Sequence, residues 1–125
     1  MIYGIGTDIV AVARLRSMWE RHGDRALDRL LAPSERAGFA SAADKGRFLA
    51  KRFAAKEAFS KALGTGVRPP ATLSAIAVGH DELGKPELQF HGQLEKMLKI
   101  KNLRAHLSIS DEADYAIAYV ILEQA

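Results

Sequence analysis

The amino-acid sequence predicts an α+β fold in one compact domain over residues 1–125. A length of 125 residues is typical of a single domain, and no linker, low-complexity tract or internal repeat divides the chain. Stretches with helical and with strand periodicity are interleaved, but they do not form a regular strand–helix–strand series. A chain of this size removes roughly two thirds of its unfolded surface from water, which is enough to form a hydrophobic core.

In the first half of the chain, one strand precedes several helical segments. Residues 2–9 mix three isoleucines with two glycines and are predicted to form a strand. Residues 11–22 carry apolar side chains at helical spacing, and Gly23 is expected to end this helix. A short helix is expected over 24–31. Pro33 then stands where the first position of a further helix would be, because its fixed φ suits that position.

The longest predicted helix covers residues 44–63 and ends at Gly64. The stretch 64–72, GTGVRPPAT, is predicted to be a loop because of its glycines and prolines. The remaining segments are a pair of strands, a short helix and a closing β-hairpin: 73–79 and 87–90, then 91–100, then 104–110 and 115–122.

Composition narrows the class of protein. Hydrophobic residues at 48% and charged residues at 26% describe a soluble globular chain. No apolar run approaches the ~18–20 residues that span a bilayer, and the N-terminus has no signal-peptide pattern. The lack of cysteine excludes disulfides and suits a reducing cytoplasm, where we expect the protein, with no membrane attachment. The net charge of +3 favours an acidic partner: a nucleic acid, a phosphorylated cofactor or an acidic protein.

Two basic side chains of the long helix lie within its apolar arc. At about 100° per residue, Arg52 and Lys56 project among phenylalanines and alanines, and neither has a carboxylate three or four residues away. Both stems could lie along apolar surface while their charged ends reach water. The unneutralised pair instead indicates a partner from elsewhere: a distant acid, another subunit or a bound phosphate.

Asp8 interrupts an apolar strand. The simpler interpretation is a helix N-cap or a turn residue, which is a common role for Asp. The functional interpretation is a carboxylate at a strand end that faces a cleft. Gly4 and Gly6 share its face of the strand, so another chain segment or a ligand could approach closely there.

Glu57 and Lys61 form the favourable i,i+4 arrangement, which by itself usually means a solvated pair on a helix. His106 lies on the polar face of an alternating strand, where it could be merely exposed. Neither feature identifies a function alone.

Four stretches, in this order, closely resemble the holo-[acyl-carrier-protein] synthase family, the small 4′-phosphopantetheinyl transferases. They are GIGTDIV at 4–10, FLAKRFAAKEAFSKALGTG at 48–66, GKP at 84–86 and HLSIS at 106–110. The pairing of an N-terminal G-x-D with a distant (F/W)-x-x-K-E-x-x-x-K is specific. The resemblance runs from Gly4 to the final YAIAYVILE segment, nearly the whole chain.

The resemblance implies the 4′-phosphopantetheinyl transferase fold, an antiparallel sheet with a long helix packed on it. It implies transfer of 4′-phosphopantetheine from coenzyme A to a serine of apo-acyl carrier protein, releasing adenosine 3′,5′-bisphosphate, in support of fatty acid biosynthesis. By resemblance, Asp8 and Glu57 bind Mg²⁺, which prefers one or two carboxylates with phosphate oxygens and water. Lys61 would add a fixed positive charge to the phosphates.

Further residues match family positions around coenzyme A. His106 matches a histidine near the cofactor that could contact phosphate or take the serine proton, but Glu57 or a magnesium-bound water could be the base instead. The remaining residues implied to lie near the nucleotide are Arg52, Lys56, Gly64, Thr65, Gly66, Lys85 and Pro86.

The family holds its acidic carrier protein with basic residues on the first two helices. The matching positions could equally be solvated helix faces, because acidic residues lie among them. They are Arg14, Met18, Arg21, Arg25 and Arg29. The family typically forms homotrimers with active sites at subunit interfaces, and the resemblance implies the same here.

Three positions depart from the family's usual pattern. Ala32 stands where many relatives have a hydroxyl cap, and Phe53 where many have tryptophan. Asp111 stands where many carry a second histidine, so no role of that histidine is assumed.

Two other functions compete with this prediction. A small basic nucleic-acid-binding domain would explain the positive charge, but the chain has no RNP-type aromatic motif and no GXXG clamp. A catalytically silent adaptor for carrier proteins is disfavoured because Asp8, Glu57 and Lys61 are all present. The preferred carrier protein and the tolerance of acylated coenzyme A are not determined.

Overall fold

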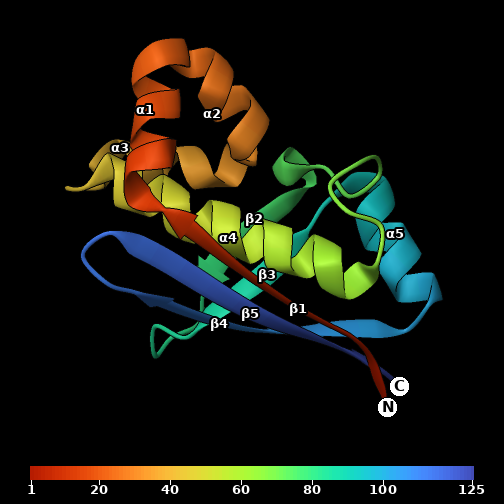
Figure 1. The fold of residues 1–125 in the computed structure, drawn as a ribbon. Coiled ribbons are helices and arrows are strands. Elements are labelled where there is room, and N and C mark those ends of the chain that lie inside the picture. The colour runs from red at the N-terminus through yellow and green to blue at the C-terminus, as the bar shows by residue number, and fades with distance from the viewer.

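The computed structural model describes all residues from Met1 to Ala125 and has an antiparallel sheet with a long helix across one face (Figure 1). The sheet has the strand order β1-β5-β4, and a separate hairpin joins β2 to β3. The strands are β1 (Ile2–Ala11), β2 (Ile76–His80), β3 (Pro86–Phe90), β4 (Leu103–Asp111) and β5 (Tyr115–Gln124).

Five α-helices and two 3₁₀ turns complete the chain, and the predicted α+β class is confirmed. The helices are α1 (Val12–His22), α2 (Asp24–Leu30), α3 (Arg36–Ser41), α4 (Lys45–Leu63) and α5 (Gly92–Ile100). The 3₁₀ turns are η1 (Pro33–Glu35) and η2 (Leu73–Ala75). No helix of the structure combines the length and the apolar character that crossing a bilayer would need.

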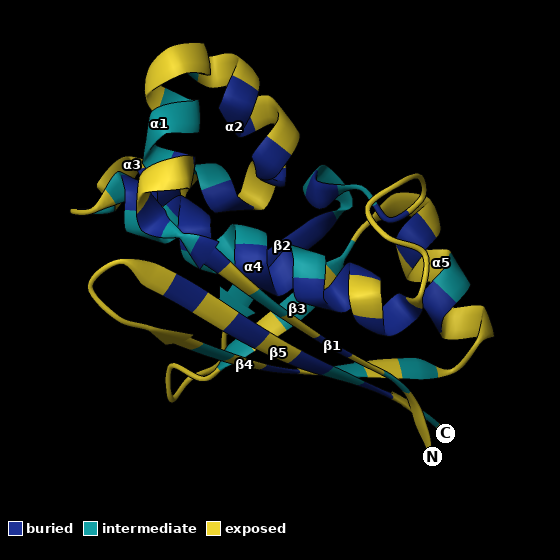
Figure 2. Ribbon diagram, viewed as in Figure 1, coloured by how far each residue is buried: buried dark blue, intermediate teal, exposed yellow.

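The central strand of the sheet is the last one in the chain. β5 pairs with β1 on one side and with β4 on the other, so Asp8 and Ile109 both lie opposite Ala118. Side chains alternate between the two faces of the sheet. One face is therefore covered by α4, whereas the other carries half-exposed side chains such as Tyr119 (Figure 2).

Glycines in β1 let α4 lie unusually close to the sheet. A Cβ at Gly4 would stand 1.8 Å from the Ala62 carbonyl oxygen, and one at Gly6 would stand 1.9 Å from that of Ala58. Any side chain at these positions would collide with helix backbone. Of the two possibilities for this face, another chain segment or a ligand, the structure shows a chain segment, the backbone of α4.

Helix α4 is buried on almost every side, which explains why its sequence shows no clear amphipathic stripe. The sheet lies on one side, α1 crosses another, and the β2–β3 hairpin and η2 close the rest (Figures 1 and 2). Asp44 caps its start by accepting a hydrogen bond from the Arg47 N–H at 3.0 Å. Gly64 ends it in the left-handed conformation, with φ of 89°.

Two local expectations were wrong. Asp8 caps no helix: it lies inside β1, which continues to Ala11, and α1 begins after Ala11 without a side-chain cap. The segment expected as a strand over 73–79 begins with η2 instead, and the strand starts at Ile76. Apolar residues in a short run do not distinguish a 3₁₀ turn from a strand, since both can bury them.

Candidate active site

Asp8 faces α4 from the sheet. The alternation of β1 puts Gly4, Gly6 and Asp8 on the covered face, and the Asp8 side chain is only 16% exposed. The Lys61 ammonium donates to Asp8 Oδ1 at 3.2 Å and to the Thr7 carbonyl oxygen at 3.0 Å. The close approach that the glycines permit thus brings a carboxylate of β1 and a lysine of α4 into contact.

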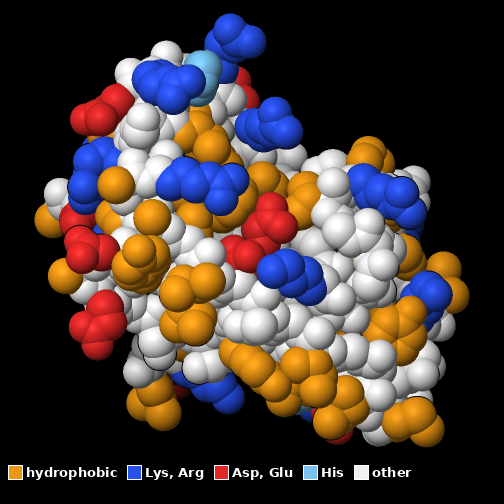
Figure 3. All heavy atoms as spheres, in the orientation of Figure 1, with side chains coloured by type: hydrophobic (Ala, Val, Ile, Leu, Met, Phe, Trp, Pro, Cys, Tyr) orange, Lys and Arg blue, Asp and Glu red, His pale blue; other side chains and the backbone are white.

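Glu57 lies one helical turn before Lys61 and projects toward the same place. Burial raises the pKa of the Glu57 carboxyl, and the neighbouring Asp8 carboxylate raises it further, while Lys61 and Arg14 act in the opposite direction. A carboxyl whose ionisation is opposed by a neighbouring carboxylate is a favourable place for a cation. Figure 3 shows acidic side chains in the middle of the face where β1, α1 and α4 meet, with a basic side chain on either side of them.

The donor set at this position fits Mg²⁺. No group of three or more His, Cys, Asp or Glu residues that could hold a metal occurs in the structure, so Asp8 and Glu57 would be the only protein carboxylates. Mg²⁺ commonly binds one or two carboxylates and takes its other ligands from substrate phosphates and water. The site therefore suits a magnesium–diphosphate complex better than a metal enclosed by protein.

Arg14 of α1 stands at the rim of this site. Its guanidinium carbon lies 5.3 Å from the centre of the Phe53 ring, and Phe53 is one turn before Glu57. The other residues predicted to dock a carrier protein continue along α1 and α2: Met18 is half-buried, and Arg21, Arg25 and Arg29 are exposed. Arg14 links these residues to the carboxylate pair.

Lys56 and Arg52 point away from Asp8 and Glu57, toward a buried carboxylate that sequence reasoning had not identified. The Lys56 ammonium is fully buried and donates to Glu35 Oε1 at 2.6 Å and to the Leu30 and Leu73 carbonyl oxygens at 2.7 and 3.0 Å. Arg52 Nε lies 3.1 Å from Glu35 Oε2. Of the partners left open above, the distant acid is confirmed.

The prediction that Lys56 contacts coenzyme A therefore does not fit the structure. An ammonium has three N–H donors, and all three of Lys56 are used inside the protein. Burial lowers the pKa of Lys56 to about 8, although the Glu35 carboxylate favours its charged form. Burial also lowers the pKa of Arg52, against the influence of Glu35. Both side chains hold the interior together. The guanidinium carbon of Arg52 also lies 3.7 Å from the centre of the Phe48 ring.

Glu35 could have been suspected from two signals together. It follows Pro33 at the start of a helical segment, where a carboxylate is common, and the chain contains two basic residues on one helix face with no local acid. Neither signal shows that the two segments meet. Only the packing of η1 against α4 brings them into contact.

The remaining predicted cofactor residues fall into two groups. Gly64, Thr65 and Gly66 follow directly after Lys61, at the exposed C-terminal end of α4. Lys85 ends the turn between β2 and β3, and Pro86 is the first residue of β3; this turn lies far from that end of α4 in the view of Figure 1. One chain does not bring the two groups together.

His106 also lies apart from the carboxylate pair. It pairs with Ile121 across the sheet, and this register puts it on the face opposite to Asp8 and α4. His106 Nε2 is 3.0 Å from Glu123 Oε1, and this contact lowers the pKa of the exposed Glu123 carboxyl. Within one chain, His106 therefore does not lie near Asp8 and Glu57.

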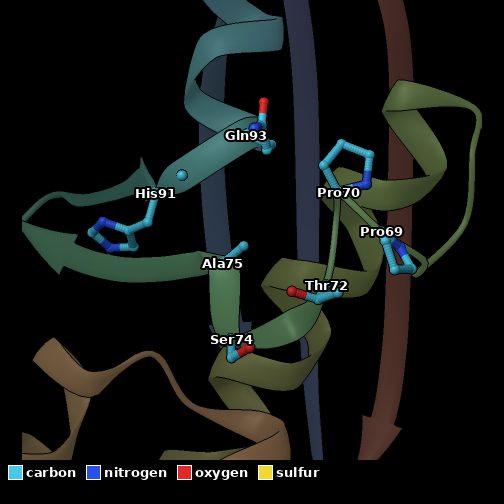
Figure 4. A pocket seen from close by; sticks show the side chains of 8 residues that line it. Pro69, Pro70, Thr72, Ser74, Ala75, His91 and Gln93 are labelled. Carbon is cyan, nitrogen blue, oxygen red and sulfur yellow. The ribbon is translucent and has the colours of Figure 1, made fainter.

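A hollow of about 720 Å³ occurs elsewhere, between residues 69–75 and the start of α5 at 91–93 (Figure 4). Its lining side chains are prolines, hydroxyls, an amide and one imidazole, with no carboxylate, lysine or arginine. None of the residues predicted for catalysis or for coenzyme A lines it. This hollow is therefore separate from the carboxylate pair of Asp8 and Glu57.

Comparison with known proteins gives consistent matches. The model of the 4′-phosphopantetheinyl transferase superfamily matches residues 4–120. A holo-[acyl-carrier-protein] synthase of Dechloromonas aromatica (strain RCB) is 82% identical over 125 residues, which is 100% of both chains.

Solved structures agree in fold. The crystal structure of holo-[acyl-carrier-protein] synthase from Neisseria meningitidis superposes with a TM-score of 0.95 at 46% identity, over 99% of this chain and 100% of that one. A holo-(acyl-carrier-protein) synthase from Bacillus anthracis, in complex with CoA (3′,5′-ADP), superposes with a TM-score of 0.83 at 36% identity, over 100% and 99%.

Proposed function

Because the chain belongs to the 4′-phosphopantetheinyl transferase superfamily, and to the holo-[acyl-carrier-protein] synthases within it, we propose that Asp8, Glu57 and Lys61 form its reactive centre. The enzyme transfers 4′-phosphopantetheine from coenzyme A to acyl carrier protein. The observation that carries the assignment of residues is the meeting of two carboxylates and a lysine where β1 crosses α4.

The reaction is a displacement at phosphorus. The serine oxygen of the carrier protein forms a bond to the phosphorus that bears the pantetheine arm. The bond from that phosphorus to the bridging oxygen of the diphosphate breaks, and adenosine 3′,5′-bisphosphate leaves with the electron pair. The serine proton passes to a base. The protein's main task in such a transfer is to hold the phosphates and to compensate charge.

Asp8 and Glu57 would hold Mg²⁺. When bound, this ion would polarise the phosphoryl oxygens and neutralise charge that develops on the leaving group. Lys61 lies 3.2 Å from Asp8 Oδ1 and is half-exposed, so its ammonium can turn from the carboxylate toward a phosphate oxygen. Gly64, Thr65 and Gly66 would line the same phosphates from the loop that follows.

Glu57 is one candidate for the base, although a carboxylate that holds Mg²⁺ is a weaker proton acceptor than a free one. His106 and a metal-bound water are the alternatives, and His106 could act only from another copy of the chain.

We propose that the enzyme is a homotrimer whose active sites lie at subunit interfaces, in the cytoplasm. The face of the sheet away from α4 is apolar and exposed, with Ile5, Ile9, Ile117 and Tyr119 each 42–61% accessible. A patch of this kind favours association with another protein surface. Since His106 lies on this face, a neighbouring copy would supply it, and Lys85 with Pro86, to the Asp8 site.

The acidic carrier protein would dock on α1 and α2. Arg21, Arg25 and Arg29 are exposed there, Met18 offers an apolar contact, and Arg14 stands between this surface and Glu57. Basic residues of this kind attract an acidic partner and orient it.

Intact-mass spectrometry of apo-acyl carrier protein, incubated with the enzyme and coenzyme A, tests the whole proposal. We expect the carrier protein to gain the mass of phosphopantetheine in the presence of Mg²⁺ and not in the presence of EDTA. Equal gain in both would contradict the metal assignment. No gain with a folded, verified carrier protein would contradict the proposed substrate.

A further inference from the structure

Glu35 is the centre of a buried charged cluster, defined by Glu35, Lys56 and Arg52. Its carboxylate accepts three hydrogen bonds, from the Ala32 N–H and Lys56 at Oε1 and from the Val78 N–H at Oε2, and it forms an ion pair with Arg52, whose Nε lies 3.1 Å from Oε2. The Glu35 side chain is 2% exposed. One carboxylate thus joins the start of η1, strand β2 and two successive turns of α4.

On its opposite side α4 rests on β1 through small residues. Gly4 and Gly6 meet the backbone of Ala58 and Ala62 there, and glycine and alanine provide no large side chains that interlock. Large side chains hold the helix elsewhere: Phe59 is fully buried, and its ring centre lies 4.8 Å from that of Phe90. The Glu35 cluster is therefore one of several contacts that orient α4, and it is the one that adjoins Glu57 in the chain.

Lys56 immediately precedes Glu57 on the helix, and consecutive residues project about 100° apart. Holding Lys56 against Glu35 and the Leu30 and Leu73 carbonyls therefore also sets the direction in which Glu57 projects. Buried polar groups are best attested as devices that select one register among several packings of similar stability.

We propose that Glu35 is a positioning residue for the reaction. By binding Lys56 and Arg52 it sets the rotation of α4, and so it aims Glu57 at Asp8 to complete the metal site. This role rests on the proposed function of Asp8 and Glu57. It assigns Glu35 no contact with substrate or metal.

A purely stabilising role would have different consequences. Replacing a buried ion pair by uncharged side chains of similar volume is often neutral for stability, because the cost of desolvating both charges disappears with their attraction. The double variant Glu35→Gln with Lys56→Met removes both charges of the fully buried pair, while Arg52 keeps its contact with the Phe48 ring. A stabilising role predicts that this variant keeps normal metal binding for as long as it remains folded.

The test compares wild type with this double variant below its melting temperature. Mn²⁺ binding to the protein without coenzyme A is measured by electron paramagnetic resonance, and the Mg²⁺ dependence of phosphopantetheine transfer is measured by intact mass. We expect the Kd for Mn²⁺ and the Mg²⁺ concentration at half-maximal rate each to rise about tenfold, as they do when residues that orient metal ligands are lost. Unchanged values in the folded double variant would overturn the proposal.

Asp44→Asn is the matched control, because it weakens another contact of α4, the Asp44–Arg16 ion pair, far along the helix from Glu57. It should leave Mn²⁺ binding unchanged, and a loss of affinity equal to that of the double variant would also overturn the proposal. Should the double variant fail to fold, Glu35→Gln, which keeps the volume of the side chain but removes the charge that binds Lys56 and Arg52, replaces it. An unaltered Mn²⁺ affinity in Glu35→Gln would then overturn the proposal.

An error in the metal assignment and an error in the role of Glu35 would give different results. If wild type neither binds Mn²⁺ nor requires Mg²⁺, the metal assignment to Asp8 and Glu57 is wrong, and the positioning role falls with it. If wild type does both and the folded double variant matches it, only the role of Glu35 is wrong.

Discussion

Asp8 and Glu57 come from different elements, and each depends on the other to form a cation site. The charged form of Glu57 is disfavoured when no cation is bound, because both its burial and the charge of Asp8 raise its pKa. Lys61 compensates part of this charge but is itself half-exposed. These charges support the proposal that the site takes a ligand with both a metal ion and phosphate oxygens.

Asp8→Asn and Glu57→Gln are each expected to slow transfer by about 100-fold or more. A metal ion contributes several kcal/mol to stabilisation of the transition state, and each 1.36 kcal/mol corresponds to a factor of ten in rate. Rates are measured by intact mass at saturating coenzyme A, with circular dichroism to verify folding. Glu95→Gln on the exposed side of α5 is the control and should retain full activity. Near-normal Mg²⁺-dependent rates in both variants would refute the assignment.

At the scale of single elements, the contact between β1 and α4 depends on the absence of side chains. Gly6→Ala would place a methyl group 1.9 Å from the Ala58 carbonyl oxygen, and the obstacle is backbone, which cannot rotate away. We expect the free energy of unfolding to fall by at least about 1–3 kcal/mol, the usual cost of overpacking.

Gly38→Ala is the control for this substitution. Its new methyl group would lie 3.2 Å from the Phe48 ring, which can shift, and alanine is the better helix former. Urea unfolding monitored by circular dichroism measures both variants. A Gly6→Ala protein as stable as Gly38→Ala would mean that the sheet and the helix can separate without cost.

The start of α4 should make stability depend on pH in the acidic range. The Arg47 N–H and then the Arg16 guanidinium hold the pKa of Asp44 below its ordinary value of 3.8. A carboxyl with a lowered pKa in the folded state stabilises the fold above the pKa it has when unfolded, and this contribution is lost as the pH falls through the folded pKa.

Asp44→Asn keeps an N-cap acceptor but removes the charge. We therefore expect it to melt at a lower temperature than wild type at pH 7, and we expect the difference to shrink as the pH falls below about 4. Thermal melts at a series of pH values test this. A difference that is constant over the whole range would exclude an electrostatic contribution of Asp44.

At the scale of the whole molecule, the proposed active site needs more than one chain. His106 projects from the opposite face of the sheet to Asp8, and that face carries an exposed apolar patch. We expect light scattering after size-exclusion chromatography to give the mass of three chains. A monomeric mass for an active enzyme would contradict the shared site.

Complementation between two inactive variants tests the same point more directly. Asp8→Asn and His106→Ala should each be nearly inactive alone. When they are unfolded together and refolded as a mixture, some sites would combine an intact Asp8 from one chain with an intact His106 from another. Activity above the sum of the separate variants supports sharing. A mixture no more active than its components would show that each chain works alone or that His106 has no role.

Much of this protein could be predicted from the chain because the relevant signals are local. The end of α4 follows from Gly64, and the strands at the end of the chain follow from strict alternation. Gly4 and Gly6 indicated that another segment or a ligand could approach their face of the strand closely. The family motifs identified the reaction and the residues proposed to carry it out, because motif spacing reflects which side chains the fold brings to one site.

Tertiary structure alone decided which charges meet. Lys56 and Glu57 are neighbours in the chain, yet one enters a dry interior to bind Glu35 while the other turns to Asp8. His106 faces away from both. An ion pair between distant segments leaves no periodic pattern in a sequence, because it depends on the packing of whole elements. The sequence by itself determined the elements, the family and the motif residues, whereas only the fold determined the partner of each charge.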